Sequence, residues 1–394
     1  MSKPKKIIVF GGAAVEVDRS TGDAYIKEPF YHYLSDLASY GVPVVFFAMA
    51  RWLDSADVRF TCSLRQAGVE VVPLKRGIKN WPLYWPKLLA YTKGAAFISF
   101  LPNALGLLPI VSILKRHLKV WAVYVGNDWI AHAAESNFRG IPLGRYFYLA
   151  AYEKMLKAAS LGIARGKQAQ IRMQTYCREV ELTLPLGHID LSQDLEAHRP
   201  VFQDSKRFLY VGKLEWRKGL GELLKAFKQY DERVEDCAEL SIIGTGPDVD
   251  KIKELASDLG LTQKVDFAGW VDSGEVLSRH WGRSDALVMP SSIHKEGVPR
   301  VIDEALARGL PVCATAIGGV PDEFTNGEVH LVEPASVSAL RDGMLEITNN
   351  ESLRAGLITA GSRRIDLWRQ FVSAGHQHYK MIEAVCARET RLEG

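Results

Sequence analysis

The chain is poor in cysteine and nearly balanced in charge. It has five cysteines in 394 residues, and they lie far apart: Cys62, Cys177, Cys237, Cys313 and Cys386. None of them forms a C-x-x-C pair, which argues against a disulfide framework or a zinc knuckle and favours a reducing compartment. The formal net charge of +3 is too small to indicate a nucleic-acid-binding surface by itself, so no nucleic-acid partner is expected. An anionic small ligand is compatible with it.

Long hydrophobic runs are also scarce. At the N-terminus the apolar run IIVF is only four residues long before two glycines, which is typical of a first strand and too short for a signal peptide. Residues 95–114 are 20 residues without a charge, a length that fits a membrane span. Pro102 and Pro109 interrupt this stretch. We therefore expect a buried strand, a turn and a helix there.

Several catalytic signatures are missing. The chain has no G-x-x-x-x-G-K-[ST], no H-E-x-x-H and no G-x-S-x-G sequence, which removes P-loop, zincin and α/β-hydrolase interpretations. Neither FGGAAV (residues 10–15) nor IIGTGPD (residues 242–248) matches G-x-G-x-x-G. No acidic residue stands where a dinucleotide ribose would need one, so a dehydrogenase is not expected.

Strand-like and helix-like segments alternate from one end of the chain to the other. Strands are predicted at KIIVFGG, VPVVFFAMA, VEVVPLK, AAFISFL and VWAVYVG in the first half, and a second alternation begins at FLYVGKL. This pattern is typical of parallel βαβ units, so we predict an α/β fold with two doubly wound domains and a cleft between them. The predicted boundaries are residues 1–190, a polar linker at 191–205, residues 206–370, and a C-terminal helical segment at 371–394 that packs back on the first domain.

Two turns in the second half are candidate anion sites. In YVGKLEWRKGLGELL (residues 210–224), Lys213 and Lys218 follow a predicted strand and Gly219 precedes a predicted helix. Glycines and a helix N-terminus suit a bound phosphate, although a solvated basic turn accounts for the same residues. Gly244 and Gly246 follow the next strand, and tight strand-to-helix turns use such glycines without any ligand.

A pair of carboxylates marks a third candidate site, in HKEGVPRVIDEALARGLPV (residues 294–312). We predict a helix that starts at Pro299 and ends at Gly309. Glu304 lies on that helix four residues after Arg300, an ordinary ion-pair spacing worth only ~0.3 kcal/mol, whereas Glu296 lies before it. Carboxylates accept hydrogen bonds from hydroxyls, and the backbone amides near Gly297 and Val298 suit phosphate oxygens. A ligand with hydroxyls and a diphosphate, such as a sugar nucleotide, fits this set.

These segments, in this order and spacing, resemble the large fourth family of retaining glycosyltransferases, which have the GT-B fold of two Rossmann-like domains facing each other across a cleft. The resemblance implies that Lys213, in a place usually held by Arg, and Lys218 hold the donor diphosphate. It implies that Glu296 contacts the transferred sugar and Glu304 the nucleotide ribose. The other donor-binding residues that it implies are Gly244, Gly246, Gly269, Trp270, Gly297, Val298 and Pro299.

The first half resembles the family less closely. Gly11 and Gly12 occupy the place of a glycine-rich loop near the donor phosphates. Many members have a histidine after the strand that corresponds to VWAVYVG, but here the sequence continues as GNDW. Asn127 or Asp128 stands at that position, and we carry Asp128 as a candidate catalytic residue.

The resemblance implies a UDP- or GDP-sugar donor, a hydroxyl acceptor, and synthesis of a glycoconjugate or cell-surface polysaccharide. No cofactor or metal is expected. The polar segment 13–28 is either an acceptor-binding loop or a surface loop. NWPLYWPK (residues 80–87) gathers Trp81, Tyr84 and Trp85 near lysines, which suits either a lipid-linked acceptor at a membrane surface or packing under the sheet. We expect a cytoplasmic enzyme, and membrane association follows only from the first of these two alternatives. Another GT-B enzyme, such as an epimerase or a phosphorylase, and a non-catalytic sugar-nucleotide-binding protein remain as alternatives.

Overall fold

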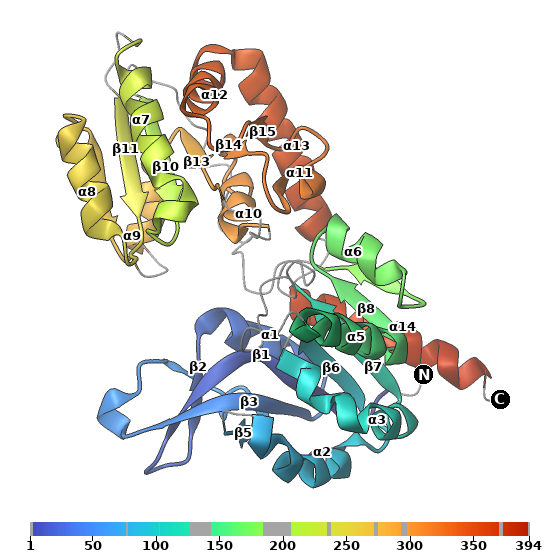
Figure 1. The fold of residues 1–394 in the computed structure, drawn as a ribbon. Coiled ribbons are helices and arrows are strands. Elements are labelled where there is room, and N and C mark those ends of the chain that lie inside the picture. Colours follow the sequence, from blue (N-terminus) through green and yellow to red (C-terminus); the bar gives the residue numbers. More distant parts are fainter. Residues whose placement is uncertain are drawn as a thin grey trace. The chain divides into compact units, whose positions relative to one another are not determined.

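The computed structural model describes residues 3–75, 78–101, 103–126, 143–183, 206–234, 238–271, 275–292, 298–369 and 373–392. The chain divides into two compact units. Unit 1 consists of Met1–His188 together with Phe371–Gly394, and unit 2 consists of Ile189–Gln370. Each unit is built on its own sheet (Figure 1). The predicted linker at 191–205 lies outside the described residues.

The sheet of unit 1 is mainly parallel. Its strands are β1 (Ile7–Asp18), β2 (Ala24–Ile26), β3 (Val44–Leu53), β4 (Cys62–Ser63), β5 (Val69–Leu74), β6 (Ala96–Leu101), β7 (Val120–Val125), β8 (Leu161–Ala164) and β9 (Val180–Leu182). β1 runs parallel to both β3 and β6, and the parallel pairing continues from β6 through β7 and β8 to β9. β3 pairs with β5 on the other side. The expected doubly wound arrangement of parallel strands is confirmed.

β1 is longer than expected. A shift in its register with β3 lies between Phe10 and Ala14, where Gly11 and Gly12 have positive φ angles of 79° and 90°. Glycine tolerates such angles at a bulge without strain. Beyond the bulge the strand continues to Asp18 and pairs with β2 in an antiparallel hairpin. The interpretation of residues 13–28 as a loop was therefore wrong.

Buried hydrogen bonds hold this extension in place. Glu16 is buried, and its Oε2 accepts bonds from the amides of Arg59 (2.7 Å) and Phe60 (2.9 Å). Asp18 accepts from the hydroxyls of Ser20 (2.7 Å) and Ser55 (2.8 Å). These bonds lower the pKa of Asp18 to about 2. Both acids therefore stabilise the hairpin through hydrogen bonds. The local sequence pattern did not predict that they are buried.

Helices cover both faces of the sheet. They are α1 (Glu28–Ala38), α2 (Trp85–Thr92), α3 (Val111–His117), α5 (Leu143–Ala158), α6 (Lys167–Gln174) and α14 (Ala374–Leu392), with 3-10 helices η1 (Ser55–Asp57), η2 (Ile78–Tyr84) and η3 (Asn103–Ile110). Neighbouring residues of a strand point to opposite faces. Phe100 packs against Phe30 of α1, whereas Phe97 shares a core cluster with Leu88 of α2 and Leu114 of α3.

α14 belongs to unit 1 although it follows all of unit 2 in the sequence. It contacts α1, β7 and β8. His378 is fully buried, with Nδ1 3.0 Å from the Tyr33 hydroxyl and Nε2 2.6 Å from the Thr183 hydroxyl. Burial lowers the pKa of His378 to about 3, so the ring is neutral and can donate to one hydroxyl and accept from the other. The rings of Tyr40 and Tyr379 stack at 3.6 Å.

The uncharged stretch at 95–114 forms β6, η3 and the start of α3, as predicted. Among the described residues, none of the helices combines the length and the apolarity needed to cross a bilayer. In the aromatic segment at 80–87, Tyr84 and Trp85 are half-buried against the core cluster under the sheet. The side chain of Trp81 lies outside the described residues.

The sheet of unit 2 is fully parallel. Its strands are β10 (Lys206–Val211), β11 (Ala238–Ile243), β12 (Val265–Gly269), β13 (Ala286–Met289), β14 (Val312–Thr315) and β15 (His330–Val332). Their spatial order is β12-β11-β10-β13-β14-β15, so the order reverses between β10 and β13. In open α/β sheets, such a reversal is the point where the connecting helices pass to opposite faces and where ligands bind.

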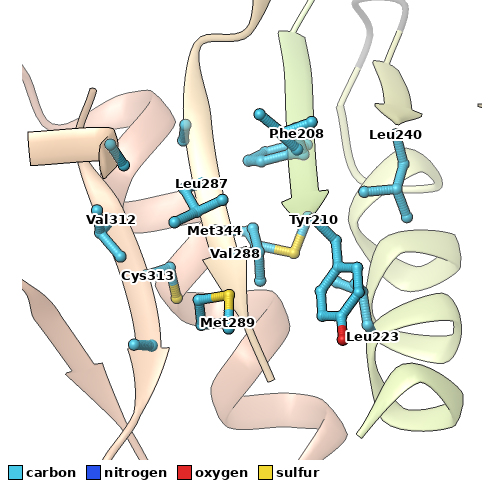
Figure 2. Close-up of a cluster of buried hydrophobic side chains, with 14 of the residues drawn as sticks. Phe208, Tyr210, Leu223, Leu240, Leu287, Val288, Met289, Val312, Cys313 and Met344 are labelled. Atoms are coloured by element: carbon cyan, nitrogen blue, oxygen red, sulfur yellow. The ribbon is translucent and has the colours of Figure 1, made fainter. Parts of the chain in front are cut away.

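The helices of unit 2 alternate with these strands up to β15, and two more follow it. They are η5 (Trp216–Lys218), α7 (Leu220–Asp231), α8 (Val249–Asp258), α9 (Glu275–Arg283), α10 (Arg300–Leu306), α11 (Val320–Glu323), α12 (Val337–Asn349) and α13 (Glu351–Arg369). Figure 2 shows the apolar core between sheet and helices, where Phe208, Leu287 and Cys313 from three strands meet Leu223 of α7 and Met344 of α12. This core fixes the strand ends that carry the candidate site.

Candidate site at the carboxyl edge of the unit 2 sheet

The candidate residues of unit 2 gather at one edge of its sheet. Because all six strands are parallel, their carboxyl ends lie at the same edge, where ligands of open α/β sheets bind. Lys213 and Lys218 follow β10, Gly244 and Gly246 follow β11, and Trp270 follows β12. Val298 and Pro299 lie between β13 and α10. The sequence therefore located this edge correctly, strand by strand.

The turn after β10 carries three cations, two of which pair with one buried carboxylate. Glu215 is buried, and both Lys213 and Arg217 form ion pairs with it. These two cations hold the pKa of Glu215 at about 2, so it stays ionised at neutral pH. Lys213 and Arg217 are exposed and Lys218 is half-buried. Sequence reasoning missed Glu215, although its place between the cations in KLEWRK is a visible signal.

Two contacts tie the β10 turn to the end of β13 across the point where the strand order reverses. The Ser292 hydroxyl donates to the carbonyl of Arg217 at 2.8 Å. Gly219 has φ +75°, and a Cβ atom there would lie 1.8 Å from the carbonyl oxygen of Pro290. Only glycine fits such an approach. The two loops at the reversal are thus held together by one side-chain hydrogen bond and by one close approach of their backbones.

The glycines after β11 allow a second close approach. A Cβ atom would lie 1.9 Å from the Gly212 carbonyl oxygen at Gly244, and 2.1 Å from the Leu214 carbonyl oxygen at Gly246. The amide of Leu214 also donates to the carbonyl of Thr245 at 2.9 Å. These glycines are therefore required for packing of the two turns, whether or not they also contact a ligand.

A D-x-D triplet, Asp248-Val249-Asp250, follows this turn and bears on the expectation that no metal is needed. Asp248 Oδ2 accepts the backbone amide of Trp216 at 2.7 Å, so this carboxylate fixes the start of η5. Among the described residues, no group of three or more His, Cys, Asp or Glu side chains is arranged to hold a metal ion.

The helix with the second carboxylate is short. α10 begins at Arg300, with Pro299 as its N-cap, and ends at Leu306. The helix thus starts one residue after the predicted Pro299, and it ends three residues before the predicted Gly309. The expected core face is confirmed, since Val301, Ile302, Ala305 and Leu306 are buried. Glu304 is half-buried and lies 3.6 Å from Arg300 Nη2. Glu296 and Gly297 lie outside the described residues.

A buried ion pair anchors α10, and no sequence argument identified it. Asp303, next to Glu304, is fully buried, with its Oδ1 3.4 Å from Arg364 Nε on α13. Arg364 also pairs with Glu323 and lies 4.7 Å from the ring of Trp368. Asp303 and Arg364 are 61 residues apart in the chain, so no local pattern links them.

The remaining candidates differ in their surroundings. Trp270 directly follows Gly269, which has φ +70°, and its side chain is 70% exposed. Gly12 belongs to unit 1, where a Cβ atom would lie 2.7 Å from the ring of Phe30, so the packing of α1 requires glycine there. Asn127 and Asp128 lie outside the described residues.

Two Rossmann-like units, the second with a basic, glycine-lined turn at its strand reversal, are the architecture of the GT-B fold. Residues 193–364 match the family model described as "Glycosyl transferases group 1".

Parts of the chain are similar in sequence to known glycosyltransferases. The chain is 36% identical over 120 residues to an uncharacterized glycosyltransferase of Methanocaldococcus jannaschii, covering 30% of each chain. It is 30% identical over 166 residues to a GDP-mannose-dependent phosphatidylinositol monomannoside mannosyltransferase of Mycolicibacterium smegmatis, covering 40% of this chain and 43% of the relative. These matches span less than half of the curated relatives.

A solved structure extends the likeness to nearly the whole chain. Anabaena HepE in complex with UDP superposes with a TM-score of 0.62 at 15% identity, covering 98% of this chain and 99% of that one. At this identity the likeness establishes the GT-B fold.

Proposed function

We propose that the protein transfers a sugar from a nucleotide-diphosphate-sugar donor to a hydroxyl acceptor, with retention of configuration at the anomeric carbon. The observation that carries the proposal is the turn after β10, which places Lys213, Arg217 and Lys218 within six residues of one another at the strand reversal. Three cations beside close-packed backbone suit a diphosphate. The segment that matches the glycosyl transferases group 1 family contains this turn.

The roles of the residues follow from the charge that develops in the reaction. The diphosphate gains negative charge as the glycosidic bond breaks, and Lys213 and Lys218 stabilise it in place, without a required metal. Glu296 orients the sugar through its hydroxyls and Glu304 holds the ribose. Gly244, Gly246, Trp270, Gly297, Val298 and Pro299 complete the donor site. We assign residues 206–370 to donor binding and residues 1–190 to the acceptor side, joined by the linker at 191–205, with Gly12 near the donor phosphates and Asp128 as a candidate catalytic residue.

The donor is a UDP- or GDP-sugar in this proposal. Among the similar proteins, Anabaena HepE has been crystallised with UDP and the mycobacterial mannosyltransferase is named as GDP-mannose-dependent. A thermal-shift panel of UDP-, GDP-, ADP- and dTDP-sugars separates them, because a ligand that binds only the folded state raises its Tm. If none of the four sugar nucleotides raised the Tm, the proposal would be contradicted.

The acceptor is a lipid-linked glycoconjugate or polysaccharide precursor, and the enzyme works in the cytoplasm at a membrane surface. The name of the mycobacterial relative includes a phosphatidylinositol acceptor, which supports this class. Radiolabelled donor sugar incubated with lipid extracts, followed by organic extraction, measures the transfer. Label that stays wholly in the aqueous phase would argue against a lipid-linked acceptor.

Substitution of the diphosphate-binding lysines tests the mechanism directly. We expect Lys213→Ala, Lys218→Ala and Glu296→Ala each to lower kcat by roughly 100-fold or more, the effect of removing one preorganised group that stabilises a transition state. Lys225→Ala, an exposed lysine on α7, is the matched control and should leave turnover unchanged. Near-normal kcat in one of the three variants would remove that residue from its assigned role.

A further inference from the structure

One part of unit 1 contains cations and no acids. From Val71 to Asn127 the chain has eight Lys or Arg residues and no Asp or Glu. At the average acid content of this chain, about seven would be expected in a stretch of that length. Such a bias is not needed for folding, since surface charges of mixed sign serve solubility equally well. It indicates a surface that meets a negatively charged partner.

Besides buried strands, this stretch forms η2, α2 and α3. α2 contacts both η2 and α3, and Figure 1 shows α2 and α3 side by side in unit 1. Leu88 of α2 and Leu114 of α3 point into the core. The opposite sides of these helices are exposed. We call this surface the basic face and define it by six exposed residues: Leu83, Lys87, Lys93, Ile113, Lys115 and Arg116.

Backbone contacts join the ends of α2 and α3. The amide of Gly94, just after α2, donates to the carbonyl of His117 at the end of α3 (3.1 Å). The start of the chain adds more cations here, because the Lys5 amide donates to the Gly94 carbonyl (3.1 Å) and Lys6 Nζ lies 4.8 Å from the ring centre of Tyr91. An acid from another element does reach α2: Glu70 of β5 accepts the Tyr91 hydroxyl.

Two large apolar side chains stand among these cations. Leu83 is 72% exposed and Ile113 is 44% exposed. An anionic phospholipid surface uses both kinds of group, because its headgroups attract Lys and Arg and its acyl boundary accepts Leu and Ile. A nucleic-acid backbone would use the cations but not the exposed aliphatic groups.

We propose that the basic face docks unit 1 on an anionic phospholipid surface. This deepens the proposed function, since it names the surface on which a lipid-linked acceptor would be met. Vesicle binding and donor binding are nevertheless measured separately, so one can fail without the other.

Flotation of the full chain with vesicles tests the proposal. We expect it to float with vesicles of equimolar phosphatidylcholine and phosphatidylglycerol, and not with phosphatidylcholine alone. Binding should weaken as salt is raised, because ions screen exposed charges. Each basic residue near such a surface contributes roughly five-fold in affinity. The double variant Lys115→Glu/Arg116→Glu should therefore bind at least roughly 20-fold more weakly, and Leu83→Ser should also bind more weakly.

The control is Lys225→Glu on α7, which reverses an exposed charge in unit 2 and should float like the unaltered protein. A cooperative thermal transition at the Tm of the unaltered protein verifies that each variant is folded. Equal flotation of the double variant and the control would overturn the proposal, as would the absence of flotation of the unaltered protein. Binding to a DNA oligonucleotide in place of vesicles would also overturn it. If vesicles bind and no nucleotide does, the proposed function fails and the docking surface stands.

Discussion

At the scale of single residues, Gly219 carries the most specific constraint in the candidate site. Its φ of +75° disfavours any other residue, and a Cβ atom would lie 1.8 Å from the Pro290 carbonyl oxygen. We expect Gly219→Ala to destabilise unit 2 by about 2–5 kcal/mol, the combined cost of a left-handed alanine and of an overpacked contact. Urea unfolding followed by circular dichroism measures the loss.

Gly260 provides a matched control for Gly219. Its φ of +70° is similar, but a Cβ atom there would have no neighbour within 4 Å. Gly260→Ala should therefore lose only the conformational part, about 1–2 kcal/mol. Equal losses of stability in the two variants would mean that the contact with Pro290 adds nothing to the cost of Gly219→Ala.

The ion pair between Asp303 and Arg364 leads to a second prediction. Arg364→Ala leaves the fully buried Asp303 carboxylate without its guanidinium, and breaking a buried pair in this way costs about 3–5 kcal/mol. Arg300→Ala removes a more exposed cation, 41% exposed, from Glu304, and should cost less than about 1 kcal/mol. Chemical denaturation of both variants makes the comparison. A similar small loss in both would argue against Arg364 as the anchor of α10.

These residues also mark the limit of what the sequence could predict. The lysines, the glycine turns and the buried side of α10 follow from local spacing, so their places along the strands were predicted correctly. Asp303 and Arg364 meet only because the sheet brings α10 and α13 together. The same holds for the buried Glu16, whose carboxylate accepts hydrogen bonds from the distant amides of Arg59 and Phe60. Partners distant in sequence decide the burial of such charged groups.

At the scale of elements, α14 is attached to unit 1 through a neutral histidine. Because burial lowers the pKa of His378 to about 3 while an exposed histidine has a pKa near 6.5, the unfolded chain binds a proton between these values and the folded chain does not. Stability is therefore complete above pH ~6.5 and falls as pH decreases, by about 1.4 kcal/mol per pH unit until the folded pKa is reached.

His378→Gln tests this prediction, because glutamine keeps one donor and one acceptor but does not titrate. We expect the variant to be less stable at pH 7 and to lose less stability than the unaltered protein between pH 6.5 and pH 4.5. Thermal melts across that range compare the two slopes. Identical slopes would show that another group accounts for the acid sensitivity.

The sequence predicted which strands exist better than it predicted where each strand ends. β6 and β7 were predicted from apolar runs and are fully buried. β1 was predicted to end at its glycines, because a glycine pair normally marks a turn. Its continuation depends on pairing with β2 and with the second half of β3, and tertiary pairing of this kind overrides local preference.

At the scale of the whole molecule, unit 2 is inserted between two parts of unit 1. We expect a fragment of residues 189–370 to unfold cooperatively by itself, because its sheet and core cluster come entirely from that range. Residues 1–188 alone should be poorly folded, because they lack α14. Joining 371–394 to residue 188 through a flexible glycine-serine linker should restore a cooperative transition. Circular dichroism during urea titration follows all three fragments, and a stable fold of 1–188 alone would contradict this prediction.

The position of α14 has a consequence for synthesis on the ribosome. Tyr33 and Thr183 emerge early, but their partner His378 emerges only after the whole of unit 2. The domain that begins first is therefore completed last, and unit 2 can reach its own core beforehand, since domains generally fold as units during translation. Until then, the surface on α1 that α14 will cover stays open to other binding partners. We expect a chaperone that recognises apolar surface to bind there until α14 covers α1.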